Sequence, residues 1–102
     1  MKVDFKTNKQ TVIAVNALLS RYDNIEFYSL NKRQKVPFAM RMELRYIFIK
    51  KTMSCNPAKD FKMKLPYYLA DELLDVIREY CESGAYNNGI ELLKNQLHPQ
   101  LL

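Results

Sequence analysis

Apolar side chains recur with helical spacing in three parts of the sequence. Residues 8–22 are apolar nearly all round between their polar ends, which is typical of a central, buried helix. Residues 66–83 place apolar side chains on one face of a helical wheel and charges on the other, and residues 88–97 carry an apolar stripe. We therefore predict a helix over each of these three ranges.

Residues that favour helix starts support these ranges. Thr7 with Gln10, and Asn88 with Glu91, have the spacing of a capping box, in which two side chains satisfy free backbone N–H groups. Pro66 has the fixed φ that suits a first helical position. We predict that these residues begin the first, the last and the 66–83 helix, respectively.

Residues 38–50 give conflicting signals. Pro37 suits a helix start, strong helix formers follow it, and the cations that end the segment would oppose the negative end of a helix dipole. Several apolar residues nevertheless alternate with other residues as in a strand, and on a helical wheel they split into two arcs: Met40, Met42, Leu44, Tyr46 and Phe48. We predict a helix, because composition and end signals agree, and we keep a strand as the alternative.

Together these elements predict a mostly α fold, a single compact domain of about four helices that spans residues 1–102. The alternative is an α+β fold with a small antiparallel sheet built from residues 25–30, 38–50 and 60–65. The chain has only two glycines, which argues against sandwiches and barrels because those folds need many tight turns.

Nearly all of the excess positive charge lies between residues 32 and 51. This segment has a balance of +6 in a chain of net charge +5. Its single acid is Glu43, and its cations are Lys32, Arg33, Lys35, Arg41, Arg45, Lys50 and Lys51. We interpret residues 32–35 as a basic connection. If a helix follows, Arg41 and Arg45 stack one turn apart with Glu43 on its far side.

The 66–83 helix carries the compensating negative charge, a balance of −4. One acidic face is predicted from residues spaced by four, four and three: Asp71, Asp75, Glu79 and Glu82. An acid–base pair or a magnesium site could use such carboxylates, but we interpret them as a solvated face. Basic and acidic patches on one small protein favour docking, either within the fold or between two copies.

Several classes of chemistry lack the residues that they need. The chain has one histidine, His98, and two cysteines, Cys55 and Cys81, without metal-type or nucleophile spacing. We therefore predict no catalytic, cofactor-binding or metal-binding residue and argue against an enzyme. A secretory signal and a membrane-length apolar run are also missing, so we expect a cytoplasmic protein with free thiols. Abundant Lys, Asn, Tyr, Phe and Ile suggest a bacterial or phage origin.

Two functions compete for the basic segment 32–51. We favour a small non-catalytic accessory protein that acts through a protein–protein surface, including self-association to a homodimer. The alternative is nucleic-acid binding, with the cations on phosphates and with Phe38, Tyr28 and Tyr46 stacking on unpaired bases. Charges that only keep the domain in solution are a third interpretation. Neither a membrane partner nor a small-molecule ligand is predicted.

Overall fold

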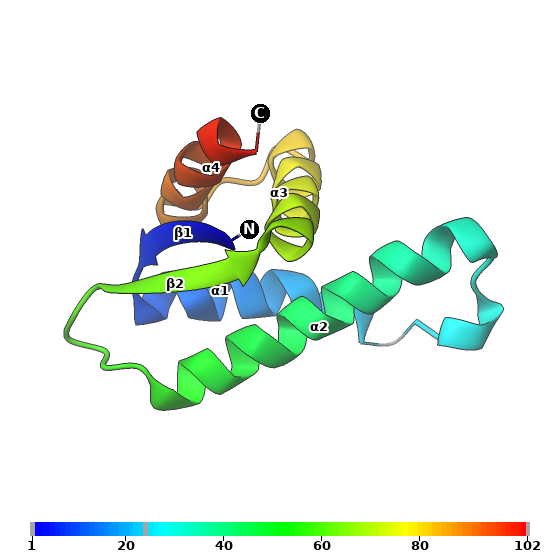
Figure 1. The fold of residues 1–102 in the computed structure, drawn as a ribbon, viewed down its shortest axis with the longest axis horizontal. Helices are drawn as coiled ribbons and strands as arrows, with labels where there is room; N and C mark the ends of the chain where they lie inside the picture. Colours follow the sequence, from blue (N-terminus) through cyan, green and yellow to red (C-terminus); the bar gives the residue numbers. More distant parts are fainter. Residues whose placement is uncertain (1, 24, 102) are drawn as a thin grey trace.

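The computed structural model of the chain describes residues 2–23 and 25–101. Within them lie two strands and four α-helices: β1 (Lys2–Thr7), α1 (Lys9–Leu19), α2 (Lys32–Ser54), β2 (Phe61–Pro66), α3 (Tyr67–Glu82) and α4 (Asn88–Gln100). Short 3-10 turns at Ser20–Tyr22 and Phe27–Ser29 connect α1 to α2. The fold is therefore mostly α, as predicted, with a small antiparallel sheet added (Figure 1).

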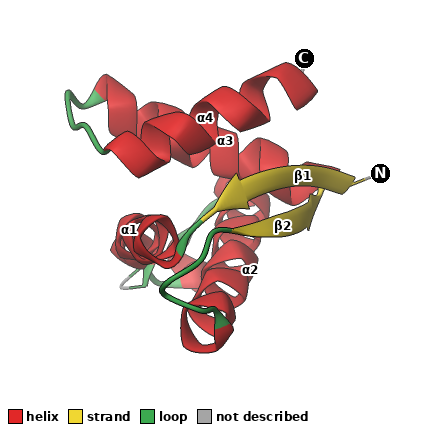
Figure 2. Ribbon diagram, turned by 90° about the vertical axis from the view of Figure 1, so that its left-hand side faces the viewer, coloured by secondary structure: helices red, strands yellow, loops and turns green. Residues whose placement is uncertain are grey.

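The sheet is a two-stranded ribbon that lies between α4 and α2 (Figure 2). β1 runs antiparallel to β2, with Val3 opposite Leu65 and Phe5 opposite Met63. These four side chains are buried, while the alternating lysines of both strands are exposed. The period of two thus places one face of the ribbon on the core and the other in solvent.

Two glutamines of α4 cover the free edge of β1. The carboxamide of Gln96 accepts from the Lys6 N–H at 2.7 Å and donates to the Lys6 carbonyl at 2.8 Å. Gln100 repeats this pattern on Asp4, at 3.4 and 2.7 Å. Because a carboxamide presents the same donor and acceptor as a peptide group, the pair replaces a third strand at this edge.

One hydrophobic core joins all of these elements. The fully buried side chains come from both strands and all four helices, and α3 contributes the most. On α2, Leu44 and Phe48 reach this core. The C-terminal half of α2 packs across the body, and its first turns, together with the connection that precedes them, extend beyond the sheet and the other helices (Figure 1).

The helix predicted over residues 38–50 is confirmed, whereas its predicted start and the predicted connection before it are wrong. α2 begins at Lys32, so residues 32–35 form its first turn instead of a connection, and Pro37 lies inside it. Residues 38–50 are helical and residues 25–30 contain a 3-10 turn, so neither range is a strand. Of the three strand ranges in the α+β alternative, only 60–65 is largely confirmed, and its partner is β1, which we did not predict.

The predicted helix caps shift by one residue. Asn8 caps α1 by accepting from the Thr11 N–H at 2.9 Å, and Asn87 caps α4 by accepting from the Ile90 N–H at 3.1 Å. Pro66 is the cap residue of α3, which begins at Tyr67. The Thr7–Gln10 and Asn88–Glu91 boxes are therefore wrong, since a neighbouring Asn can present its side-chain oxygen to the free N–H groups.

Candidate functional site

The basic segment of the sequence is one continuous helix, α2. Its start is fixed by a capping box, in which Asn31 accepts from the Gln34 N–H at 3.0 Å and the Gln34 side chain accepts from the Asn31 N–H at 3.2 Å. Pro37 lacks the N–H that would bond to the Arg33 carbonyl, and the helix continues past it. Packing of the C-terminal half onto the core, added to this cap, stabilises the whole element.

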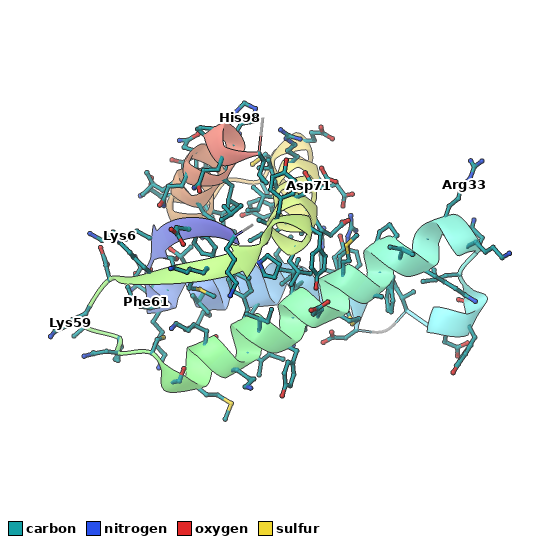
Figure 3. All side chains as sticks on the ribbon, in the orientation of Figure 1. Lys6, Arg33, Lys59, Phe61, Asp71 and His98 are labelled. Carbon is teal, nitrogen blue, oxygen red and sulfur yellow. The ribbon has the colours of Figure 1, made fainter. Side chains whose placement is uncertain are left out.

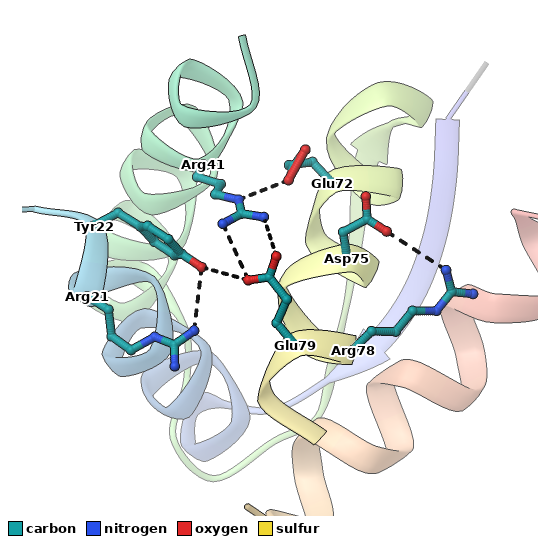
Figure 4. Close-up of polar contacts among 7 residues, drawn as sticks. All are labelled: Arg21, Tyr22, Arg41, Glu72, Asp75, Arg78 and Glu79. Carbon is teal, nitrogen blue, oxygen red and sulfur yellow. Dashed lines mark hydrogen bonds and ion pairs between the residues drawn. The ribbon is translucent and has the colours of Figure 1, made fainter. Parts of the chain in front are cut away.

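The inner face of α2 is held to α3 by Arg41 (Figure 4). Its Nε lies 2.9 Å from Glu72 Oε2, and its Nη2 lies 3.0 Å from Glu79 Oε1. Its guanidinium also stacks over the ring of Tyr22, whose hydroxyl donates to Glu79 at 3.2 Å. One arginine thus connects α2, α3 and the turn after α1.

Burial sets the protonation of this cluster. The Arg41 and Glu72 side chains are only 15% and 7% exposed. Burial raises the pKa of Glu72 above the ordinary carboxyl value, and the hydrogen bond from Arg41 opposes this rise. Burial lowers the pKa of Arg41. Its hydrogen bonds to Glu72 and Glu79 and its charge interactions together raise this pKa by more than burial lowers it, so Arg41 stays charged.

Arg45 is tied to the end of α1. Its Nη1 donates to the Asn16 carbonyl at 3.3 Å, and its Nη2 lies 3.2 Å from Asp23 Oδ2. Next to it, the Asn16 side chain donates to Thr52 Oγ1 at 2.8 Å. These contacts place a cation at the negative end of the α1 dipole and fix the crossing of α1 and α2.

The structure therefore separates the seven predicted cations. Arg41 and Arg45 do stack one turn apart on a helix, but they face the body and are paired there. Lys50 lies over the ring of Tyr46 at 5.0 Å, and Lys51 over that of Phe61 at 4.8 Å. The remaining three, Lys32, Arg33 and Lys35, lie on the first turn of α2, where Arg33 projects away from the body (Figure 3).

The predicted acidic face of α3 is also divided. Glu79 binds Arg41, and Asp75 lies 3.8 Å from Arg78 of the same helix. Asp71 and Glu82 are exposed. Glu72, on the same helix, is buried against α2. The predicted docking of basic and acidic patches thus takes place within the fold, through Arg41 and two glutamates.

The outer face of α2 carries an exposed apolar row that we did not predict. Met42, Tyr46, Ile49 and Met53, spaced by four, three and four residues, share one side of the helix, and we call them the outer stripe. Tyr46 is 62% and Met53 82% exposed, Ile49 is 37% exposed, and Met42 is half-buried. The sequence signal was present, because the apolar residues of this segment split into two arcs on a helical wheel.

We also searched for metal ligands, reactive cysteines and membrane-spanning helices. Among the described residues no cluster of three or more His, Cys, Asp or Glu side chains could hold a metal ion. Cys55 and Cys81 are free thiols, and burial raises the pKa of Cys81, which donates from Sγ to Glu91 at 3.7 Å. Within the same residues, no helix is long and apolar enough to cross a membrane.

Comparison of the chain with protein-family models, with curated proteins and with solved structures found no match.

Proposed function

We propose that this protein is a non-catalytic accessory protein that binds a partner protein through the outer stripe of α2. The observation that carries the proposal is the exposure of Tyr46, Ile49 and Met53, next to half-buried Met42, on a helix whose opposite face is fixed to the body. An apolar row on a rigid helix fits an apolar helix or groove of a partner. Methionine and tyrosine suit such a contact, since one adapts its shape and the other buries a large ring.

The charges around the outer stripe favour an acidic partner. Lys50 lies beside Tyr46, and the first turn of α2 adds the cations Lys32, Arg33 and Lys35. Glu43 is the one acidic residue of α2. Two copies of α2 packed in parallel through this face would bring like charges together. We therefore favour a different protein with carboxylates around an apolar centre, and the homodimer stays a prediction.

Site-specific photo-cross-linking tests this proposal. A cross-linking amino acid at position 46 should yield one discrete adduct with a partner in the source cells. The same group at position 92 is the matched control, because Leu92 is similarly exposed at 56% but lies on α4. Equal labelling at both positions, or no adduct at position 46, would contradict the proposal. An adduct of twice the chain's mass would identify a second copy instead.

Nucleic-acid binding through residues 32–51 is the second candidate. Lys32 and Arg33 at the exposed tip of α2, together with exposed Tyr46, favour it. The internal pairing of Arg41 and Arg45 weakens it, because these residues were the centre of the expected basic ridge. Retention on heparin and on a short DNA at about 50 mM salt, lost in a Lys32→Ala/Arg33→Ala variant, would support it. The absence of any binding at that salt would exclude it.

A further inference from the structure

The outer stripe of α2 has the spacing of a coiled-coil seam. Its four residues are separated by four, three and four positions, which is the alternation of a and d positions in a heptad. The stripe covers nearly two heptads, or about 17 Å of helix. A face with this spacing packs best against another helix that runs nearly parallel or antiparallel to it.

Two opposite charges flank the outer stripe on the same side. Glu43 and Lys50 both occupy the e position of this heptad, and both are exposed. Seven residues separate them, about 10 Å along the helix, so they are too far apart to pair with each other. Among the described residues neither forms an ion pair. The Tyr68 hydroxyl donates to Glu43 at 3.0 Å, which positions this carboxylate beside the stripe.

The body of the protein does not obstruct the outer stripe. Arg41 and Arg45 hold the opposite side of α2 to α3 and to the end of α1. The sheet and the other helices lie on that inner side (Figure 2). A second helix can therefore lie along the exposed side chains of Tyr46 and Met53.

A second copy of α2 that runs antiparallel matches this pattern. About a two-fold axis midway along the stripe, Tyr46 of each copy lies level with Ile49 of the other. Met42 and Met53 are brought level in the same way. The axis also brings Glu43 of each copy beside Lys50 of the other, so two contacts between opposite charges form. In the parallel orientation each charge would instead lie level with its own copy.

We propose that the outer stripe pairs antiparallel with the outer stripe of a second copy while no partner protein is bound. This inference rests on the proposed function, since it states what covers the same surface in the free protein. An interface of four apolar side chains per copy is smaller than that of a stable dimer, so the pairing is weak. A partner protein with a longer apolar face and more carboxylates would displace the second copy.

Sedimentation equilibrium of the purified chain tests the pairing, because no partner protein is present. At low salt, the wild type should change from monomer to dimer as its concentration is raised to about 1 mM. Glu43→Lys and Lys50→Glu should each weaken self-association about tenfold, because both charge contacts become repulsive. A wild type that stays monomeric over this range would overturn the inference. The proposed function would still stand if position 46 cross-links a different protein.

A mixture of the two variants tests the orientation. When a Glu43→Lys chain pairs antiparallel with a Lys50→Glu chain, both contacts again join opposite charges. The mixture should therefore dimerise about as tightly as the wild type and about tenfold more tightly than either variant alone. The control is Asp71→Lys with Lys59→Glu, which reverses exposed charges outside α2 and should match the wild type alone and mixed (Figure 3). A mixture no tighter than its components, or the same response in the control, would contradict the antiparallel pair.

Discussion

Arg41 Nε lies 2.9 Å from Glu72 Oε2, and this ion pair joins the inner face of α2 to α3 in a nearly dry environment. The ion pair brings opposite charges of the two helices together, and it does not involve the basic first turn of α2. It also fixes the rotation of α2 about its own axis. Because the inner face is fixed in this way, the outer stripe is held toward solvent.

Removal of Arg41 should cost considerable stability. Arg41→Ala leaves the Glu72 carboxylate buried without its partner, and the expected loss is about 3 kcal/mol. Urea denaturation measures the change in the free energy of unfolding. Arg33→Ala is the matched control on the same helix, and its expected change is within about 0.5 kcal/mol. Similar losses for both variants would show that the Arg41 cluster does not hold α2.

The pH dependence of stability should report Glu72. Its folded-state pKa is raised by burial, so between the ordinary carboxyl pKa and this raised value the folded chain binds more protons than the unfolded one. The contribution of Glu72 to stability therefore increases as the pH falls through this window and decreases as the pH rises. Gln cannot titrate, so wild type should gain stability relative to Glu72→Gln on acidification. The opposite trend would mean that the ion pair outweighs burial.

The glutamine cover of β1 should protect the amide of Lys6 from exchange. Gln96→Ala removes both hydrogen bonds to the Lys6 backbone, and the expected cost is about 1–2 kcal/mol. Hydrogen exchange at Lys6 should become faster, while exchange in α3 changes only as much as global stability does. Gln10→Ala serves as the control, because Gln10 is an exposed glutamine outside this contact. Unchanged protection of Lys6 would contradict the role assigned to Gln96.

The crossing of α1 and α4 should depend on Gly89. Alanine normally favours a helix over glycine by about 1 kcal/mol, yet Gly89→Ala should destabilise the protein because its Cβ would collide with Thr11 Oγ1. In a Thr11→Ala background the same substitution should cost less, because the hydroxyl is gone and only the close contacts to the Cβ at position 11 (3.2 Å) and to Asn87 Oδ1 (3.3 Å) remain. Thermal unfolding of the four variants of this double-mutant cycle measures the coupling. Additive effects would show that the two residues do not interact.

The sequence predicted a helix well where its apolar residues lay on a single face of the helical wheel. α3 and α4 bury single apolar faces, and their ranges were close to those observed. β1 was missed because six alternating residues stabilise nothing alone, and their partners, β2 and Gln96, lie more than fifty residues away. The start of α2 was placed at Pro37, although Asn31 and Gln34 form a local capping box that was available in the sequence.

The candidate site was predictable only in part. The basic residues of α2 were recognised, but which of them face the body depends on long-range pairs such as Arg45 with Asp23. The two apolar arcs on the helical wheel of α2 were evidence against a helix in the sequence. The structure shows that each arc has its own place: Leu44 and Phe48 enter the core, and Tyr46 and Met53 remain exposed. A search for a single apolar face does not recognise a helix that has two apolar faces.

The central claim, that the outer stripe binds a partner protein, is tested most directly by polar substitution within the stripe. Tyr46→Ser/Met53→Ser should leave the free energy of unfolding within about 0.5 kcal/mol per site, because both side chains are exposed. Ile13→Ser/Leu92→Ser is the matched control, with exposed apolar residues on α1 and α4. With the photo-cross-linker at position 42, we expect the partner adduct to disappear in the stripe variant and to persist in the control. An adduct that survives in the stripe variant, or is lost equally in both, would contradict the account.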